Sequence, residues 1–113
     1  MTPRDREILA SIAESIRRIE GYVERAGSGW FEDGMALDAI AKRLEQVGEL
    51  AKRLPMELLG CMPEVDWRGV KGIREVLVHE YEGVEVGVVT DAIATELPGL
   101  LRAIETILAE PER

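Results

Sequence analysis

The sequence is poor in the residues that usually build metal sites, disulfides and aromatic cores. Its 113 residues include one cysteine, Cys61, and one histidine, His79, and aromatic residues make up 4%. A zinc site takes about four ligands, mostly histidine and cysteine, so counting argues against zinc, whereas the plentiful carboxylates leave an acidic magnesium site open. We assign no metal and no cofactor, and we expect leucine, isoleucine, valine and alanine to fill the core.

A single cysteine also cannot form an internal disulfide, which fits a reducing compartment. Cys61 has no basic or histidine neighbour in the sequence, so we expect a small core residue rather than a nucleophile. Long apolar runs are missing too, because no stretch approaches the ~20 apolar residues of a membrane span. Residues 1–6 lack the apolar core that follows the basic region of a secretion signal. We expect one domain over residues 1–113, in the cytoplasm and without a membrane partner.

Positive charge is scarce. The chain has 14 Lys and Arg against 22 Asp and Glu, which gives a formal net charge of −8. A nucleic-acid-binding protein usually presents a broad basic face, so any nucleic-acid contact here must be local. Residues 67–81 have the opposite balance, because they contain Arg68, Lys71 and Arg74 but only two acidic residues. Surface charge attracts partners of the opposite sign, so this positive island is the candidate binding segment.

Apolar residues at helical spacing predict a first helix at the start of the chain. Thr2, Pro3 and Asp5 have the pattern of a capping box, and a breaker run around Gly27 predicts the helix end. The apolar stripe repeats every three or four residues and consists of Ile8, Ile12, Ile16, Ile19 and Val23. After this helix, Trp30 and Phe31 are expected to be core plugs or dimer contacts.

A second helix is predicted from about residue 34 to residue 54, where Pro55 stops it. Gly48 within it costs about 1 kcal/mol relative to alanine, so close helix packing is its expected purpose. Lys42, Arg43, Lys52 and Arg53 are expected to form a solvated face, paired with Glu45 and Glu49.

After a connector over residues 55–66, Asp66 is expected to cap a third helix that covers the positive island. A fourth helical pattern begins at about Glu85, beyond a break at Gly83. Pro98 predicts a kink or a break within this last pattern. The fold is therefore predicted to be all-α, an up-and-down bundle of four to five helices.

Arg74, His79 and Tyr81 lie in the positive island, and helix geometry limits how they can act together. On an ideal helix of ~100° per residue, Tyr81 lies ~20° from Arg74, but His79 lies ~140° away. Arg74 and His79 then cannot reach one ligand atom. Either the helix ends before His79 and the chain turns back, or a second chain completes the site. We expect both, in a homodimer.

The three residue types suit RNA cleavage. Attack of a 2′-hydroxyl on its own phosphate needs a base, an acid and a cation for the developing charge. Histidine titrates near neutrality and arginine binds phosphate with a two-pronged donor fork. One histidine is too few for both proton transfers, but a symmetric dimer supplies two. On spacing alone, a lone histidine near a helix end is more often a structural hydrogen-bonding group, and that interpretation stays open.

The motif Arg74-x4-His79-x-Tyr81 resembles the Arg-x(4–6)-His-x-Tyr motif of the HepT-like family of HEPN-domain toxins. Further segments are similar to segments of this family in the same order. They are QVGELAKRL at residues 46–54, WRGVKGIR at 67–74, LVHEYEGV at 77–84 and ELP at 96–98. The ordered set covers nearly the whole chain and is therefore more specific than the short motif.

The resemblance implies a compact helical bundle that dimerises, with two motifs facing each other across a cleft. It implies a metal-independent endoribonuclease that acts as the toxin of a toxin–antitoxin pair. Arg74 would then hold the scissile phosphate and His79 would transfer protons, with Arg68 and Lys71 as further RNA-binding residues. The expected partner is an MntA-like nucleotidyltransferase antitoxin that transfers AMP to Tyr81.

The sequence departs from the family pattern at three glutamates, Glu75, Glu80 and Glu82. Carboxylates beside a phosphate site repel RNA and favour a basic partner surface. A second hypothesis is therefore a non-catalytic dimeric binding partner of a nucleotidyltransferase, with Tyr81 as the AMP acceptor or a contact. A third is a purely structural helical dimer.

Overall fold

The structure is a computed structural model that describes residues 1–79 and 83–111, apart from the side chains of Val78 and His79. Helices make up most of it, as the sequence predicts. In chain order the elements are α1 (Pro3–Ala26), the 3-10 helix η1 (Trp30–Glu32), α2 (Gly34–Ala51), α3 (Met56–Leu59), α4 (Trp67–Lys71), α5 (Ile73–Leu77), β1 (Val78–His79), β2 (Gly83–Val84), α6 (Val86–Asp91), the π-helix η2 (Ala92–Glu96) and α7 (Leu97–Ala109).

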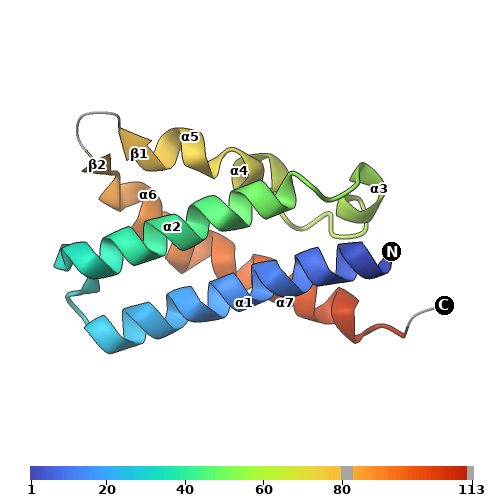
Figure 1. Cartoon of the computed structure of the whole chain (residues 1–113), viewed down its shortest axis with the longest axis horizontal. Coiled ribbons are helices and arrows are strands. Elements are labelled where there is room, and N and C mark those ends of the chain that lie inside the picture. The colour runs from blue at the N-terminus through green and yellow to red at the C-terminus, as the bar shows by residue number, and fades with distance from the viewer. Residues whose placement is uncertain (80–82, 112–113) are drawn as a thin grey trace.

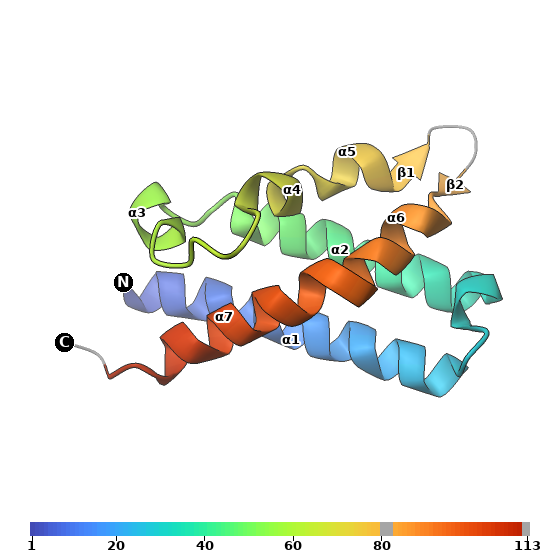
Figure 2. The same cartoon turned by 180° about the vertical axis from the view of Figure 1, so that it is seen from behind.

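The long helices α1 and α2 lie side by side along the length of the molecule (Figure 1). The chain from α4 to β1 follows the other side of α2, and α7 crosses α1 on the face seen in Figure 2. The helix α2 therefore contacts both α1 and the segment that contains the positive island.

The start of α1 confirms the predicted capping box. The backbone N–H of Asp5 donates to Thr2 Oγ1, and the N–H of Thr2 donates to Asp5 Oδ2, both at 3.0 Å. The helix ends at Gly27, whose φ of +81° lies in the left-handed region and whose N–H donates to the Val23 carbonyl at 3.0 Å.

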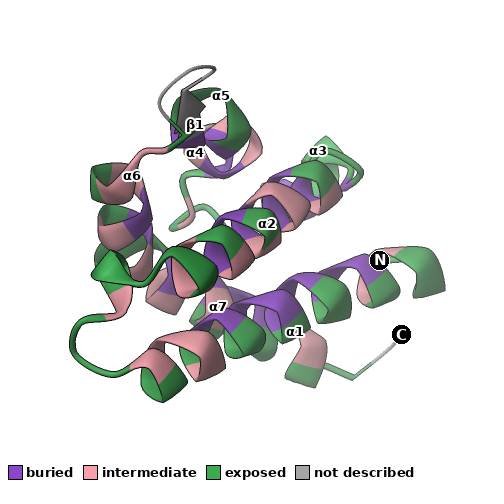
Figure 3. Ribbon diagram, turned by 60° about the vertical axis from the view of Figure 1, so that its left-hand side comes forward, coloured by how far each residue is buried: buried purple, intermediate pink, exposed green. Residues whose placement is uncertain are grey.

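The core is aliphatic, as the composition predicts. Its only aromatic member among the described residues is Trp67, whose indole N–H donates to the Met62 carbonyl at 3.3 Å. Figure 3 shows that the buried residues of α1 and α2 lie along one face of each helix. In the part of the chain that the structure describes, no helix has both the length and the apolar character needed to cross a membrane.

Gly48 allows a close approach between α2 and the segment beyond it. A Cβ atom at this position would lie 3.0 Å from the Val70 carbonyl oxygen and 3.1 Å from Ile73 Cγ2. The prediction of close helix packing is therefore confirmed. The helix itself ends at Ala51, three residues earlier than predicted, and the next residues form turns before Pro55.

The prediction of a single, continuous third helix is wrong. In place of a continuous helix through the positive island there are two short helices, α4 and α5, with Gly72 between them, and then a strand. Asp66 does cap α4, because its carboxylate accepts from the Gly69 N–H at 3.1 Å. The chain leaves the helix after Leu77, so the alternative of a helix that ends before His79 is confirmed for the backbone.

A hairpin explains why the helix stops there. The Cα of Val78 pairs with Val84 and that of His79 with Gly83, in antiparallel register. Valine is β-branched and favours extended backbone, and Gly83 has a φ of +79°, which glycine adopts at little cost. The N–H of Glu85 donates to the Leu77 carbonyl at 2.7 Å, next to the pair formed by Val78 and Val84.

The last helical pattern is interrupted near Pro98, as predicted. The π-helix η2 precedes α7, and the N–H of Leu97 donates to the Ala92 carbonyl five residues back. Pro98 occupies the first turn of α7 and has no N–H with which to continue the hydrogen bonds of η2.

The prediction for Cys61 is wrong. Cys61 is exposed rather than part of the core, because it lies just beyond the short helix α3, where its thiol contacts the Glu57 carbonyl at 3.5 Å. Trp30 packs against the core, as expected, whereas Phe31 is 40% exposed and stays a predicted dimer contact. The two rings meet edge to face with their centroids 5.9 Å apart.

Candidate functional site

Arg74 lies on the short helix α5, between the buried residues Ile73 and Leu77 in the chain, and is itself exposed. Its side chain is 65% exposed, and its Nη1 lies 4.0 Å from Glu49 Oε1 on α2. An ion pair this long and this exposed contributes little to stability. The Arg74 guanidinium can therefore exchange Glu49 for another anion at small cost.

Glu49, Lys52, Arg74 and Glu75 form one charge cluster between α2 and α5. Lys52 Nζ lies 3.2 Å from Glu49 Oε1 and 4.0 Å from Glu75 Oε1. Lys52 therefore shares Glu49 with Arg74 and also draws the Glu75 carboxylate. The predicted pairing of Lys52 with Glu49 is confirmed.

The backbone of His79 lies in β1, directly after α5. On a continuous helix, His79 would lie ~140° around the axis from Arg74, but β1 removes that constraint because the chain has already left the helix. The predicted modification site, Tyr81, lies outside the described residues, as do Glu80 and Glu82.

The two predicted RNA-binding residues lie on α4, before Arg74 in the chain. Arg68 is exposed and Lys71 is half-buried. Within residues 1–79 and 83–111, no hydrogen bond or ion pair joins the side chain of either residue to Arg74. The same residues contain no group of three or more His, Cys, Asp or Glu side chains arranged to hold a metal ion.

A second arginine-rich feature lies between α1 and α2, and sequence reasoning missed it. Arg43 was expected on a solvated face, but it is half-buried, and its guanidinium donates to Gln46 Oε1 at 3.2 Å and to the Tyr22 hydroxyl at 3.4 Å. The hydrogen bond from Arg43, with a smaller effect of Arg18, lowers the pKa of Tyr22 below its ordinary value, against the opposing effect of burial.

The sequence did contain a signal for this second feature. In the predicted second helix, Arg43, Gln46, Leu50 and Arg53 recur at spacings of three and four, which places them along one face. On α1, Ser11 and Ser15 have the same spacing. A polar face on each of two neighbouring helices predicts a polar groove between them.

Chemically, the arrangement around Arg74 supplies an exposed guanidinium fork that suits a phosphate or a carboxylate. The histidine that follows within five residues is the only one in the chain. Histidine is the side chain best able to give and take a proton near neutral pH.

Comparison with known proteins identifies relatives over most of the chain. A family model described as "Ribonuclease HepT-like" matches residues 12–107. The "Putative RNase TTE0752" of Caldanaerobacter subterraneus is 31% identical over 109 residues, which cover 95% of each chain. The "Probable ribonuclease HepT" of Thermococcus cleftensis is 30% identical over 103 residues, or 90% of this chain and 94% of the relative.

A further relative is longer than this chain. The "Gamma-glutamylcyclotransferase and putative RNase MJ0434" of Methanocaldococcus jannaschii is 30% identical over 106 residues, or 93% of this chain. The match covers 48% of that protein, so the chain spans about half of its length. No solved structure gives a significant match.

Proposed function

The chain belongs to the HepT-like ribonuclease family, and on that premise we propose that it is an endoribonuclease whose chemistry centres on Arg74 and His79. The observation that carries the proposal is the end of α5 at Leu77. On a continuous helix, His79 and Arg74 could not have contacted the same ligand. Because α5 ends at Leu77, His79 lies outside the helix and is free of that restriction.

In the proposed reaction, the 2′-hydroxyl of one nucleotide attacks the adjacent phosphate, and the bond to the 5′-oxygen of the next nucleotide breaks. A base removes the 2′-proton and an acid protonates the leaving 5′-oxygen, while Arg74 binds the phosphate as its negative charge increases. His79 supplies one proton transfer, and the His79 of a second copy supplies the other. No step requires a metal ion.

This mechanism implies a homodimer with two motifs at a shared cleft. Residues 1–113 act as one domain, a helical bundle of the HEPN type. Arg68, which is exposed on α4, and Lys71 contact RNA outside the scissile phosphate. In the cell, the protein is the toxin of a toxin–antitoxin pair, and an MntA-like nucleotidyltransferase silences it by transferring AMP to the Tyr81 hydroxyl.

One observation favours a second function. The carboxylates Glu49 and Glu75 flank Arg74 in the charge cluster, and they suit a basic protein surface better than RNA. The alternative is a non-catalytic binding partner of the nucleotidyltransferase that accepts AMP on Tyr81. Against it, Glu75 lies at ion-pair distance from Lys52, which reduces its effect on a phosphate at Arg74.

The test is incubation of total RNA with the purified protein in EDTA, beside a His79→Ala variant. Intact mass must first show that Tyr81 carries no AMP. Cleavage by the wild type and not by the variant supports the ribonuclease. Equal cleavage by both excludes His79 from the chemistry, and AMP addition to Tyr81 without any cleavage by the unmodified form selects the alternative.

A further inference from the structure

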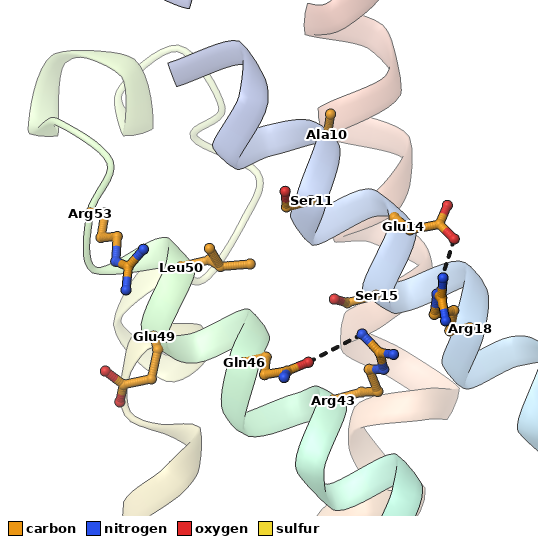
Figure 4. A pocket seen from close by; sticks show the side chains of 10 residues that line it. All are labelled: Ala10, Ser11, Glu14, Ser15, Arg18, Arg43, Gln46, Glu49, Leu50 and Arg53. Carbon is orange, nitrogen blue, oxygen red and sulfur yellow. Dashed lines mark hydrogen bonds and ion pairs between the residues drawn. The ribbon is translucent and has the colours of Figure 1, made fainter. Parts of the chain in front are cut away.

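A groove between α1 and α2 has no role in the chemistry at Arg74. Its cavity has a volume of about 610 Å³. Figure 4 shows its two walls, with α1 contributing Ser11, Ser15 and Arg18 on one side. On the other side lie Arg43 of α2 and Arg53 of the turn that follows α2. A second hollow of about 430 Å³ shares Arg53 and Ser11 with it and extends it along α1 to Arg4.

The charge of this groove differs from that of the whole protein. Four arginines line the two hollows against three glutamates, in a chain whose net charge is −8. Arg18 is neutralised by Glu14 at 3.2 Å. Arg43 is not, because its hydrogen bonds to Gln46 and Tyr22 go to neutral groups. Within residues 1–79 and 83–111, Arg53 has no ion pair at all.

The hydrogen bonds of Arg43 to Gln46 and Tyr22 hold its guanidinium at the groove without neutralising its charge. A half-buried guanidinium in this state favours an anion. The groove therefore offers two arginines, Arg43 and Arg53, whose charge the described residues do not balance.

Ser15 contributes a hydroxyl group to the groove. The residue is 5% exposed overall, and it lines the groove. In the described part of the chain its hydroxyl makes no hydrogen bond. The hydroxyl is therefore open to the groove and can donate a hydrogen bond to a ligand oxygen.

We propose that the groove between α1 and α2 binds backbone phosphates of the RNA strand that is cut at Arg74. The proposal rests on the proposed function for the identity of the ligand. The two places are linked through Glu49, which lines the groove and also lies 4.0 Å from Arg74 Nη1. From Arg4 to Arg18 the groove follows about 21 Å of α1, at 1.5 Å per residue. This length suits several nucleotides of a single strand.

The probe is a fluorescent 2′-O-methyl oligoribonucleotide, which binds as RNA does but has no free 2′-hydroxyl to attack the phosphate. Fluorescence anisotropy gives its Kd, with inorganic phosphate as a competitor. Arg53→Ala should weaken binding about tenfold, since it removes one charged contact. The slope of log Kd against log salt should fall by about 0.7, as for one phosphate contact on a single strand.

Two further variants complete the design. Ser15→Ala removes only the hydroxyl and should weaken binding about threefold, as expected for one neutral hydrogen bond. Arg102→Ala is the matched control, because Arg102 is an exposed arginine on α7 outside the groove, and it should leave the Kd unchanged. Circular dichroism melts confirm that each variant is folded.

The proposal is overturned if Arg53→Ala and Arg102→Ala bind the oligonucleotide equally well. It is also overturned if Arg53→Glu changes the oligomeric state by light scattering, because the groove would then be a contact between copies. The proposal is likewise overturned if millimolar phosphate displaces the oligonucleotide completely and the Kd does not depend on oligonucleotide length. The groove would then be a site for a small anion only. A failed ribonuclease assay leaves the binding result intact, so the two proposals fail separately.

Discussion

The charge cluster at Arg74 and the groove between α1 and α2 both contain arginine, but they hold it differently. In the charge cluster, Arg74 is exposed and faces a carboxylate at 4.0 Å on a five-residue helix. In the groove, Arg43 is half-buried on an 18-residue helix, and neutral groups hold its guanidinium in place. The first arrangement suits an arginine that changes partner during a reaction, and the second suits a fixed contact.

The comparison also concerns the supporting structure. The groove is formed by two long helices with aliphatic stripes, which pack on each other along most of their length. The segment around Arg74 consists of short elements that depend on contacts with α2, above all at Gly48. A substitution that weakens those contacts with α2 should therefore disturb the structure of the charge cluster more than that of the groove.

The largest expected effect is on catalysis at Arg74. Arg74→Ala should reduce the rate of RNA cleavage by about 10²- to 10³-fold, because it removes the cation that stabilises the phosphate charge in the transition state. Arg74→Lys should reduce the rate less, since lysine keeps the positive charge but lacks the two-pronged donor group of arginine. Initial rates on one RNA substrate measure both, and Arg25→Ala on α1 is the control. A normal rate for Arg74→Ala would remove Arg74 from the mechanism.

The second expected effect is on stability at Gly48. Gly48→Ala places a Cβ about 3.0 Å from the Val70 carbonyl, which should cost about 1–2 kcal/mol after the gain in helix propensity is subtracted. Urea denaturation measures the loss.

Gly21→Ala is the matched control on α1, where a Cβ would meet nothing within 4 Å. It should stabilise the protein by up to about 1 kcal/mol. Equal stabilisation by both variants would show that α4 and α5 do not depend on the close approach to α2.

Glu49→Gln tests the exchange of partners at Arg74. Removing the carboxylate should tighten RNA binding about two- to fivefold, which corresponds to the strength of an exposed ion pair. Glu105→Gln is the control, because Glu105 forms a similar exposed pair with Arg17 at 3.8 Å, away from the charge cluster. Weaker RNA binding by Glu49→Gln would show that Glu49 orients Arg74 rather than competing with RNA.

The smallest effect concerns Tyr22. Arg43 lowers its pKa in the folded protein, so the folded state loses this proton at a lower pH than the unfolded state. The ionisation of Tyr22 therefore stabilises the folded state increasingly as the pH rises from the lowered pKa of the folded protein toward the ordinary pKa of the unfolded chain. At neutral pH this contribution is absent. The difference in unfolding free energy between wild type and Tyr22→Phe, measured from pH 8 to 10.5, should grow with pH. A constant difference would contradict the contact with Arg43.

The sequence predicted the regular parts of the fold well, because they depend on local patterns. The capping box at Thr2, the stripe of α1 and the interruption near Pro98 each follow from a few neighbouring residues. The strand after Leu77 did not, because it depends on the pairing of Val78 and His79 with Val84 and Gly83. Cys61 was misjudged for a related reason, since its exposure is set by the position of α3 at the surface rather than by its neighbours in sequence.

For the candidate site, the sequence predicted the end of the helix before His79 but not the surroundings of Arg74. The charge cluster joins Glu49 to Arg74 across 25 positions of sequence, and no periodicity within one helix indicates such a contact. The groove was missed because Arg43 and Arg53 were interpreted as part of a solvated face. Only the packing of the two helices brings Ser15 and Arg43 to one cavity.

The central claim is that Arg74 acts in the chemical step while the groove only binds. The most direct test is steady-state kinetics of RNA cleavage by Arg74→Ala and Arg53→Ala. We predict that Arg74→Ala lowers kcat, whereas Arg53→Ala raises KM about tenfold with kcat unchanged. A fall in kcat for Arg53→Ala as large as that for Arg74→Ala would contradict the division between the two regions.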